Sequence, residues 1–388
     1  MTSAFRVAHA VHPDWRAALA LAAAQFDADP PVFTATLGFV YFSDHHAGHA
    51  HALLVALQTR WPGVAWVGAV GIGVSASGVE YFDEPGLVLM LAPMPPAHFE
   101  VFSGARPLSA IAPFSALVHA DSATHDLGEL IVEMSQRTES HYLFGGVASS
   151  RRSGMHIADG VWQGGLSGVA FSRDVALVSR VTQGCQPVGP QRRITRAERN
   201  VVLELDGKPA LECLLADLGI ASLDDRRAAL PRLQGTLVGL SQPHDMLFER
   251  GGQFGSDTKV RHLIGLDPPR QAVAVAEIVE PGMRLAFCQR DVQAARRDLV
   301  RICSEIRDAL APADDVGAMP RGQQVLGAIY ISCTGRGGAH FGGPSAELQI
   351  VQHALGDVPL VGFFAAGEIA RHHLYGYTGV LTVFVAPG

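Results

Sequence analysis

Two short apolar patterns occur twice in the chain, in the same order and at almost the same spacing. The first is LGFVYFS at 37–43 and LGAIYIS at 326–332, and both copies fit L-G-x-[VI]-Y-[FI]-S. The second is WVGAVGIG at 66–73 and LVGFFAAG at 360–367. Self-similarity in a fixed order favours an internal duplication. The alternative is chance similarity between two pairs of apolar strands.

The residues around these patterns predict a mixed fold. Helical spacing follows the first pattern in both copies, at 44–61 and 345–355, and β-branched and aromatic residues predict strands on either side. SHYLFGGVAS at 140–149 is expected to end in a Gly-Gly turn, and 311–322 is the most linker-like segment. We therefore expect an α+β fold of two related α/β halves. Mixed sheets would pack inside and helices outside, for instance as a layered sandwich.

Composition excludes several classes of protein. Of 388 residues 48% are hydrophobic and 17% charged, which is typical of a globular chain. The net charge of −7 gives no overall attraction for nucleic acid or anionic lipid. The five cysteines are scattered, with no CxxC pair, which argues for a reducing compartment. No signal peptide and no apolar run of about 20 residues is present, so we expect a cytoplasmic protein without membrane insertion.

Several stretches resemble the FIST-domain family. VSRVTQGCQPVGPQRRITRAERNVVLELDGKPAL and VRHLIGLDPPRQAVAVAEIVEPGMRLAFCQRD are similar to its central pattern, and ISCTGRGGAHFG and VGFFAAGEI to its end. The resemblance covers about 33–385. It implies an N-terminal helical extension (1–30), a FIST N-terminal domain (31–225) and a FIST C-terminal domain (226–388). The family is proposed to sense small ligands, with amino acids suggested for some members, and occurs with bacterial signal-transduction components.

A glycine-rich loop follows the second copy of the first pattern. It contains Cys333, Gly335, Arg336, Gly337 and Gly338. Glycines let the backbone approach a ligand closely and expose successive N–H groups, and an arginine offers a planar fork for a carboxylate or phosphate. The loop lacks the Gly-Lys-Ser/Thr of a P-loop, so it suits a small anion better than a nucleotide. The alternative is a glycine-rich turn with a solvated arginine.

Cys333 has three interpretations. It is a buried apolar residue at a strand end, a thiol that contacts a ligand, or a nucleophile whose pKa is lowered by Arg336. Catalysis would also need a general base within hydrogen-bond reach. The sequence does not specify such a base, so we predict no enzyme, with a reactive Cys333 as an alternative.

Three further residues complete the candidate ligand site. Glu368 follows an apolar strand, where a carboxylate needs a cation or a donor. It is expected to pair with Arg336, or to read a ligand ammonium while Arg336 reads a carboxylate. Ser43 ends the first copy of the pattern, and Ser149 lies in a small polar loop.

Histidines leave a second ligand class open. The run DHHAGHAH at 44–51 lacks HExxH and a third specified ligand, so we predict no metal site. A subset of the resembled family binds haem and senses nitric oxide, and one axial histidine would be enough. We expect a sensory protein that binds an amino acid or small carboxylate without a cofactor. It would signal to a separate protein such as a histidine kinase or cyclase, and a haem-dependent sensor is the alternative.

Overall fold

The computed structural model describes residues 4–30, 33–223, 225–243, 258–311 and 323–386. The chain divides into two compact units. Unit 1 holds Met1–Thr182 and Arg296–Gly388, and unit 2 holds Gln183–Ala295. Unit 2 is therefore an insertion in the sequence of unit 1. The linker predicted at 311–322 lies, apart from Ala311, outside the described residues.

Unit 1 opens with a set of elements that defines its architecture. They are β1 (Arg6–Val11), α1 (Trp15–Ala28), β2 (Leu37–Ser43), the 3-10 helix η1 (Asp44–His49), α2 (Ala50–Arg60), β3 (Ala65–Gly71), β4 (Gly73–Ala76), β5 (Val79–Phe82) and β6 (Gly86–Ala92). Strands β2 and β3 are parallel and α2 connects them, while β6 pairs antiparallel with β2. The hairpin of β4 and β5 leaves this sheet and joins another.

The same order of strands recurs twice more in unit 1. The second set is β7 (Phe99–Phe102), β8 (Ser115–Asp121), α3 (Leu127–Gln136), β9 (Tyr142–Ala148), β10 (His156–Ala158), β11 (Val161–Trp162) and β12 (Leu166–Phe171). The third set is β13 (Ala176–Gln183), α6 (Val292–Leu310), β22 (Val325–Cys333), η3 (Thr334–Arg336), α7 (Ala346–Leu355), β23 (Leu360–Ala365), β24 (Gly367–Arg371), β25 (His373–Tyr375) and β26 (Thr378–Val385). We call these sets repeats one, two and three.

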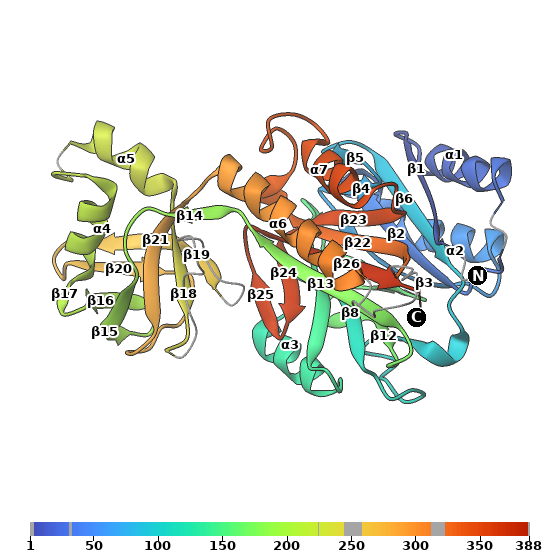
Figure 1. The fold of residues 1–388 in the computed structure, drawn as a ribbon, viewed down its shortest axis with the longest axis horizontal. Helices are drawn as coiled ribbons and strands as arrows, with labels where there is room; N and C mark the ends of the chain where they lie inside the picture. Colours follow the sequence, from blue (N-terminus) through green and yellow to red (C-terminus); the bar gives the residue numbers. More distant parts are fainter. Residues whose placement is uncertain (1–3, 31–32, 224, 244–257, 312–322, 387–388) are drawn as a thin grey trace, which may run out of the picture. The chain divides into compact units, whose positions relative to one another are not determined.

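Each repeat builds a six-stranded sheet with the same strand order. The orders are β1-β6-β2-β3-β10-β11, β7-β12-β8-β9-β24-β25 and β13-β26-β22-β23-β4-β5. Each sheet ends in a hairpin from a different repeat, so the three exchanges close a cycle. Figure 1 shows one of them, the β4–β5 hairpin of repeat one beside β23 of repeat three. The α+β class with mixed sheets is confirmed. The two matched copies are repeats one and three, and a middle copy makes three repeats rather than two halves.

Glycine allows the parallel strands to approach closely at one equivalent position in each repeat. A Cβ added there would lie 1.6, 1.9 or 1.7 Å from a carbonyl oxygen of the paired strand, at Gly68, Gly145 and Gly362 respectively. Only glycine fits without moving that backbone. Gly145 and its neighbour Gly146 thus lie inside β9, and the predicted turn at this Gly-Gly pair is wrong.

Side chains from all three repeats meet in the core of unit 1. The ring of Tyr41 from β2 stacks on Phe363 from β23, with 5.2 Å between centroids. Its hydroxyl hydrogen-bonds Nε2 of His119 from β8 at 3.1 Å. Burial lowers the pKa of His119 to about 3, so this imidazole is neutral near pH 7. The three repeats therefore share one hydrophobic core.

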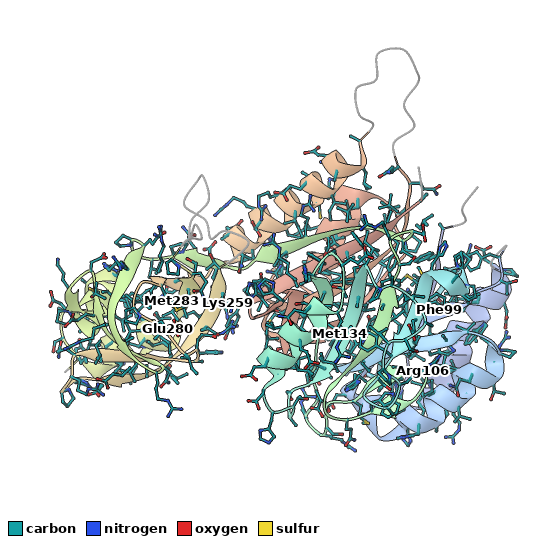
Figure 2. The ribbon with its side chains drawn as sticks, turned by 90° about the horizontal axis from the view of Figure 1, so that it is seen from below. Phe99, Arg106, Met134, Lys259, Glu280 and Met283 are labelled. Carbon is teal, nitrogen blue, oxygen red and sulfur yellow. The ribbon has the colours of Figure 1, made fainter. Side chains whose placement is uncertain are left out.

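Unit 2 has its own sheet and its own core. Its elements are β14 (Cys185–Pro187), β15 (Arg192–Glu198), β16 (Val201–Leu205), β17 (Lys208–Pro209), α4 (Ala210–Leu218), α5 (Arg226–Gln234), β18 (Thr236–Ser241), β19 (Lys259–Asp267), β20 (Ala272–Val275) and β21 (Arg284–Arg290). The Asp-Gly turn at 206–207 connects β16 to β17, and α4 follows. Met283, which is labelled in Figure 2, belongs to the hydrophobic core of this unit.

The compact units do not follow the domain boundaries expected from the resemblance. The expected boundary after residue 225 lies inside unit 2. The expected N-terminal extension supplies β1, which pairs with β6 at the edge of the first sheet. Among the described residues, no helix combines the length and apolar character needed to cross a bilayer.

Candidate functional site

The glycine-rich loop surrounds a buried ion pair at the end of β22. Arg336 donates from Nε and Nη2 to one oxygen of Glu347 at 2.8 and 2.6 Å. Tyr330 and Ser332 donate their hydroxyls to the same carboxylate at 2.7 and 2.9 Å. The side chains of Arg336 and Glu347 are only 2% and 1% exposed. Glu347 lies in the first turn of α7, so this network fastens α7 to β22.

The charge of Arg336 is stabilised inside the protein. Burial alone would lower the pKa of Arg336, but the Glu347 carboxylate raises it above its ordinary value. The guanidinium also lies over the ring of Phe341, 5.0 Å from the centroid. Nη1 is buried and has no hydrogen-bond partner among the described residues. Arg336 thus has a carboxylate partner within the fold, and that partner is Glu347 rather than the predicted Glu368.

Glu368 and Cys333 lie close to this ion pair. Oε2 of Glu368 accepts hydrogen bonds from N and Oγ1 of Thr378, at 3.1 and 2.7 Å. Burial raises the pKa of Glu368 to about 8. Burial and then the neighbouring Glu368 raise the pKa of the Cys333 thiol to about 12. Cys333 is therefore a protonated thiol near pH 7, which disfavours the reactive-cysteine interpretation.

The glycines of the loop make contacts within the protein. The N–H of Gly338 donates to Glu80 of β5 at 3.1 Å, and that of Gly335 bonds the Cys333 thiol. A Cβ on Gly337 would lie 2.1 Å from the ring of Phe82. The N–H of Gly338 and the contact of Gly337 with Phe82 thus connect repeat three to repeat one.

The two predicted serines lie at strand ends in the other repeats. Oγ of Ser43 accepts a hydrogen bond from the N–H of Gly86 at 3.1 Å. Oγ of Ser149 accepts from the N–H of Ile72 at 2.8 Å and donates to the carbonyl of Phe364. Ser149 thereby links all three repeats. The structure brings Cys333, Arg336 and Glu368 together, whereas both serines are engaged in contacts that hold strands.

A groove lies between α6 and α7. A cavity of about 560 Å³ lies between the two helices. It is lined by Arg296, Val300, Ser304 and Arg307 of α6, and by Ala346, Gln349, Ile350, His353 and Ala354 of α7. We call this set of residues the α6–α7 groove. Its lining is apolar in the middle and cationic at both ends.

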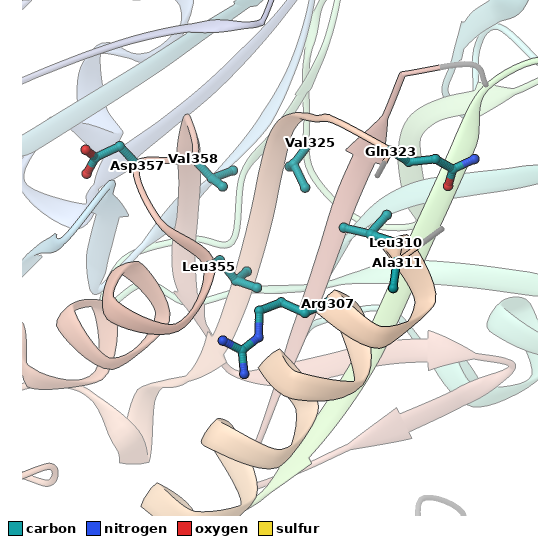
Figure 3. A pocket seen from close by; sticks show the side chains of 8 residues that line it. All are labelled: Arg307, Leu310, Ala311, Gln323, Val325, Leu355, Asp357 and Val358. Carbon is teal, nitrogen blue, oxygen red and sulfur yellow. The ribbon is translucent and has the colours of Figure 1, made fainter. Parts of the chain in front are cut away.

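A smaller cavity of about 380 Å³ continues from the groove and shares Arg307 with it. Figure 3 shows this cavity, with Leu310 and Leu355 facing the space beside Arg307. Asp357 is the acidic residue of its lining. One oxygen of Asp357 accepts a hydrogen bond from Nε2 of Gln352 at 2.9 Å, and in Figure 3 the carboxylate points away from Arg307.

Arg296 is a positioned cation of the groove that has no carboxylate partner among the described residues. Its Nη2 donates to the carbonyl of Phe341, which holds the guanidinium in place. Its Nε is buried and lacks a hydrogen-bond partner, and no described carboxylate forms a salt bridge with it. Its neighbours in the lining include Ala346 and Gln349 of the first turn of α7, whose backbone N–H groups bond the carbonyls of Gly343 and Ser345.

Repeat one has aromatic rings beside its corresponding helices. Helices α1 and α2 occupy the same places in the order of elements as α6 and α7. Phe26 of α1 packs edge to face on Trp61, the residue after α2, at 5.8 Å, and Trp15 of α1 stacks on His49, the residue before α2, at 6.2 Å. The α6–α7 groove has alanine, serine and glutamine among its lining side chains instead. Among the described residues, the α6–α7 groove of repeat three is therefore lined by smaller and more polar side chains than the rings beside α1 and α2.

Sequence reasoning did not identify the groove. The apolar face of α6 is buried in the core, because Leu299, Ile302, Cys303 and Ile306 are fully buried. The groove uses a neighbouring face, on which Arg296, Val300, Ser304 and Arg307 recur at helical spacing. That spacing was visible in the sequence, but a half-polar helix face is usually solvated.

Comparison with known proteins decides the family. Residues 36–208 match the FIST N domain and residues 210–371 match the FIST C domain. The chain belongs to the FIST family. An uncharacterized protein of Mycobacterium tuberculosis is 31% identical over 96% of this chain and 97% of its own length. An uncharacterized protein of Mycobacterium bovis is 29% identical over 96% of each chain.

The family assignment indicates a general function. FIST domains are sensory-type domains rather than catalytic ones. The boundary between the two matched domains, near residue 209, lies inside unit 2, as the expected boundary did. The FIST C match also contains α6 and α7, and therefore the whole α6–α7 groove.

Proposed function

We propose that this FIST protein is a sensory protein whose small ligand, an amino acid or a small carboxylate, binds in the α6–α7 groove. The single observation that carries this proposal is Arg296. It is a positioned guanidinium without a described carboxylate partner, and it lines a cavity of about 560 Å³. Clefts with apolar walls and a few fixed polar groups are typical of small-molecule sites.

In this proposal the buried Arg336–Glu347 pair responds to the ligand and does not contact it. Glu347 belongs to α7, and α7 supplies one wall of the groove. A ligand that shifts α7 would therefore act on the Arg336–Glu347 pair and on the end of β22. The loop residues predicted as ligand contacts then transmit the signal. Cys333 performs no chemistry, because burial holds its pKa at about 12.

The output passes to a separate protein in the cytoplasm, such as a histidine kinase or cyclase. Unit 2 is a candidate to carry the signal, because α6 continues the chain directly from it. Haem is the second ligand class, because His353 lines the same groove and would supply one axial ligand.

A thermal-shift screen tests the proposal. The panel contains amino acids, small carboxylates, nucleotides and haemin. A ligand at about 100 times its Kd adds roughly 2.7 kcal/mol, which raises the melting temperature of a chain of this size by several degrees. We expect the shift from an amino acid or carboxylate to be lost in Arg296→Gln. It should persist in Arg297→Gln, which removes an equal charge from an exposed neighbour outside the groove.

Two other results are informative. A shift that is equal in both variants would place the ligand elsewhere and contradict the proposal. A shift with haemin alone, lost in His353→Ala, would replace the small-anion ligand with haem.

A further inference from the structure

The charges around the α6–α7 groove discriminate between an amino acid and a small carboxylate, the two ligands of the proposed function. A free amino acid carries a carboxylate and an ammonium group. A site that recognises both must present a cation to one and a carboxylate or carbonyl groups to the other, because a buried unpaired charge is costly. The groove can therefore be examined for each partner in turn.

The partner for a carboxylate is present. Arg296 is already oriented by the carbonyl of Phe341, so little ordering is needed when an anion binds. Its buried Nε has no acceptor among the described residues, and a carboxylate oxygen would supply one. Ala346 and Gln349 of the first turn of α7 line the same end of the groove.

Among the described residues of the lining, no carboxylate is available to an ammonium group, and Gln349 supplies the one side-chain carbonyl. Its charged or titratable residues are Arg296, Arg307 and His353, and no aspartate or glutamate is among them. Asp357 borders the adjoining cavity, but it is engaged by Gln352 and points away from Arg307. An ammonium group beside the ligand carboxylate would thus face Arg296 without compensation.

The middle of the groove favours an apolar body. Val300 is 48% exposed, which is unusual for a large aliphatic side chain in this chain, and it lines the cavity together with Ile350. Burying these side chains against a hydrocarbon would remove apolar surface from water.

We propose that the ligand is an organic acid with an apolar body and no amino group, held by its carboxylate at Arg296. This inference rests on the proposed function and specifies its ligand class. The carboxylate lies at the Arg296 end and the body lies along Val300 and Ile350 toward Arg307.

Matched pairs of ligands test the inference by isothermal titration calorimetry. Each pair shares a carbon skeleton and differs in the amino group: 4-methylpentanoate against leucine, and 3-phenylpropanoate against phenylalanine. We expect the acid to bind roughly tenfold or more tightly than its amino acid, because the ammonium meets like charge. Arg296→Gln should weaken the acid by roughly tenfold or more, and Arg297→Gln should leave its Kd unchanged.

The outcomes separate this inference from the proposed function. If amino acids bind as tightly as the acids and lose affinity in Arg296→Gln, the groove is the site and the inference is wrong. If no compound binds, or if binding is insensitive to Arg296→Gln, both are wrong. Circular dichroism and the melting temperature of the unliganded variants show whether a loss of binding reflects a loss of folding.

Discussion

Nη2 of Arg336 lies 2.6 Å from Oε1 of Glu347, and neither side chain is more than 2% exposed. The pair connects the glycine-rich loop to the first turn of α7. Two buried charges of opposite sign stabilise each other only while both are present. The free energy of unfolding should therefore respond differently when one partner is replaced and when both are.

Removing either member of this pair should destabilise unit 1 strongly. Arg336→Met or Glu347→Gln leaves a charge without its partner, and we expect a loss of about 3–5 kcal/mol in the free energy of unfolding. The double variant Arg336→Met, Glu347→Gln should lose less than the sum of the single losses. Urea denaturation of the four proteins measures the coupling. Additive losses would show that the two side chains do not depend on each other.

Three glycines should be equally intolerant of substitution. Gly68→Ala, Gly145→Ala and Gly362→Ala each place a methyl group less than 2 Å from a carbonyl oxygen of the paired strand. We expect each to lower the free energy of unfolding by at least about 1–3 kcal/mol, as overpacking does. Gly128→Ala is the control, because no atom lies within 4 Å of the added methyl. A tolerated alanine at one position would break the proposed equivalence of the repeats.

Protonation of Glu368 should favour folding. Its pKa is about 8 in the folded protein and 4.5 as the reference value, so the folded state holds the extra proton between these limits. Stability should then fall as the pH rises from about 5 to 8. Glu80, whose pKa burial raises to about 7, contributes in the same direction. Glu368→Gln should flatten the decrease in melting temperature measured from pH 5 to 9, and an unchanged slope would contradict the assignment.

Cysteine labelling should be slow in the folded protein. All five cysteines are buried, and the pKa of the Cys333 thiol is about 12. With 5,5′-dithiobis(2-nitrobenzoate) at pH 7.5 we expect little release of thionitrobenzoate until urea unfolds the chain. Stoichiometric labelling of Cys333 without denaturant, identified by mass spectrometry, would restore the reactive-cysteine interpretation.

Local patterns predicted the elements well, because strands and helices follow from nearby residues. The helix expected at 345–355 is α7, and the strand expected at 325–332 is most of β22. The sequence alignment of the two copies of the first pattern differs by one residue from the structural alignment of β2 and β22. The sequence alignment equates Tyr41 with Tyr330, yet Tyr41 contacts His119 in the core, whereas Tyr330 bonds Glu347 of α7. Side chains alternate along a strand, so a shift of one residue exchanges the two faces.

Long-range relationships were not predictable in the same way. The middle repeat has Asp121 where the first pattern ends in serine, and its hairpin follows a longer connection after β9. The partner of Arg336 is eleven residues away on α7, and nothing local distinguishes Glu347 from Glu368. The α6–α7 groove depends on which helix faces remain uncovered, which only the packed fold determines.

The most direct test of ligand binding in the α6–α7 groove is to fill it. Val300→Trp adds an aromatic ring at a half-exposed position in the lining, much as aromatic rings pack beside α1 and α2. Val132→Trp on α3 is the matched control, at another half-exposed valine. We predict that 4-methylpentanoate raises the melting temperature of the wild type and of Val132→Trp, but not that of Val300→Trp. An equal increase in all three proteins would show that the ligand binds outside the groove.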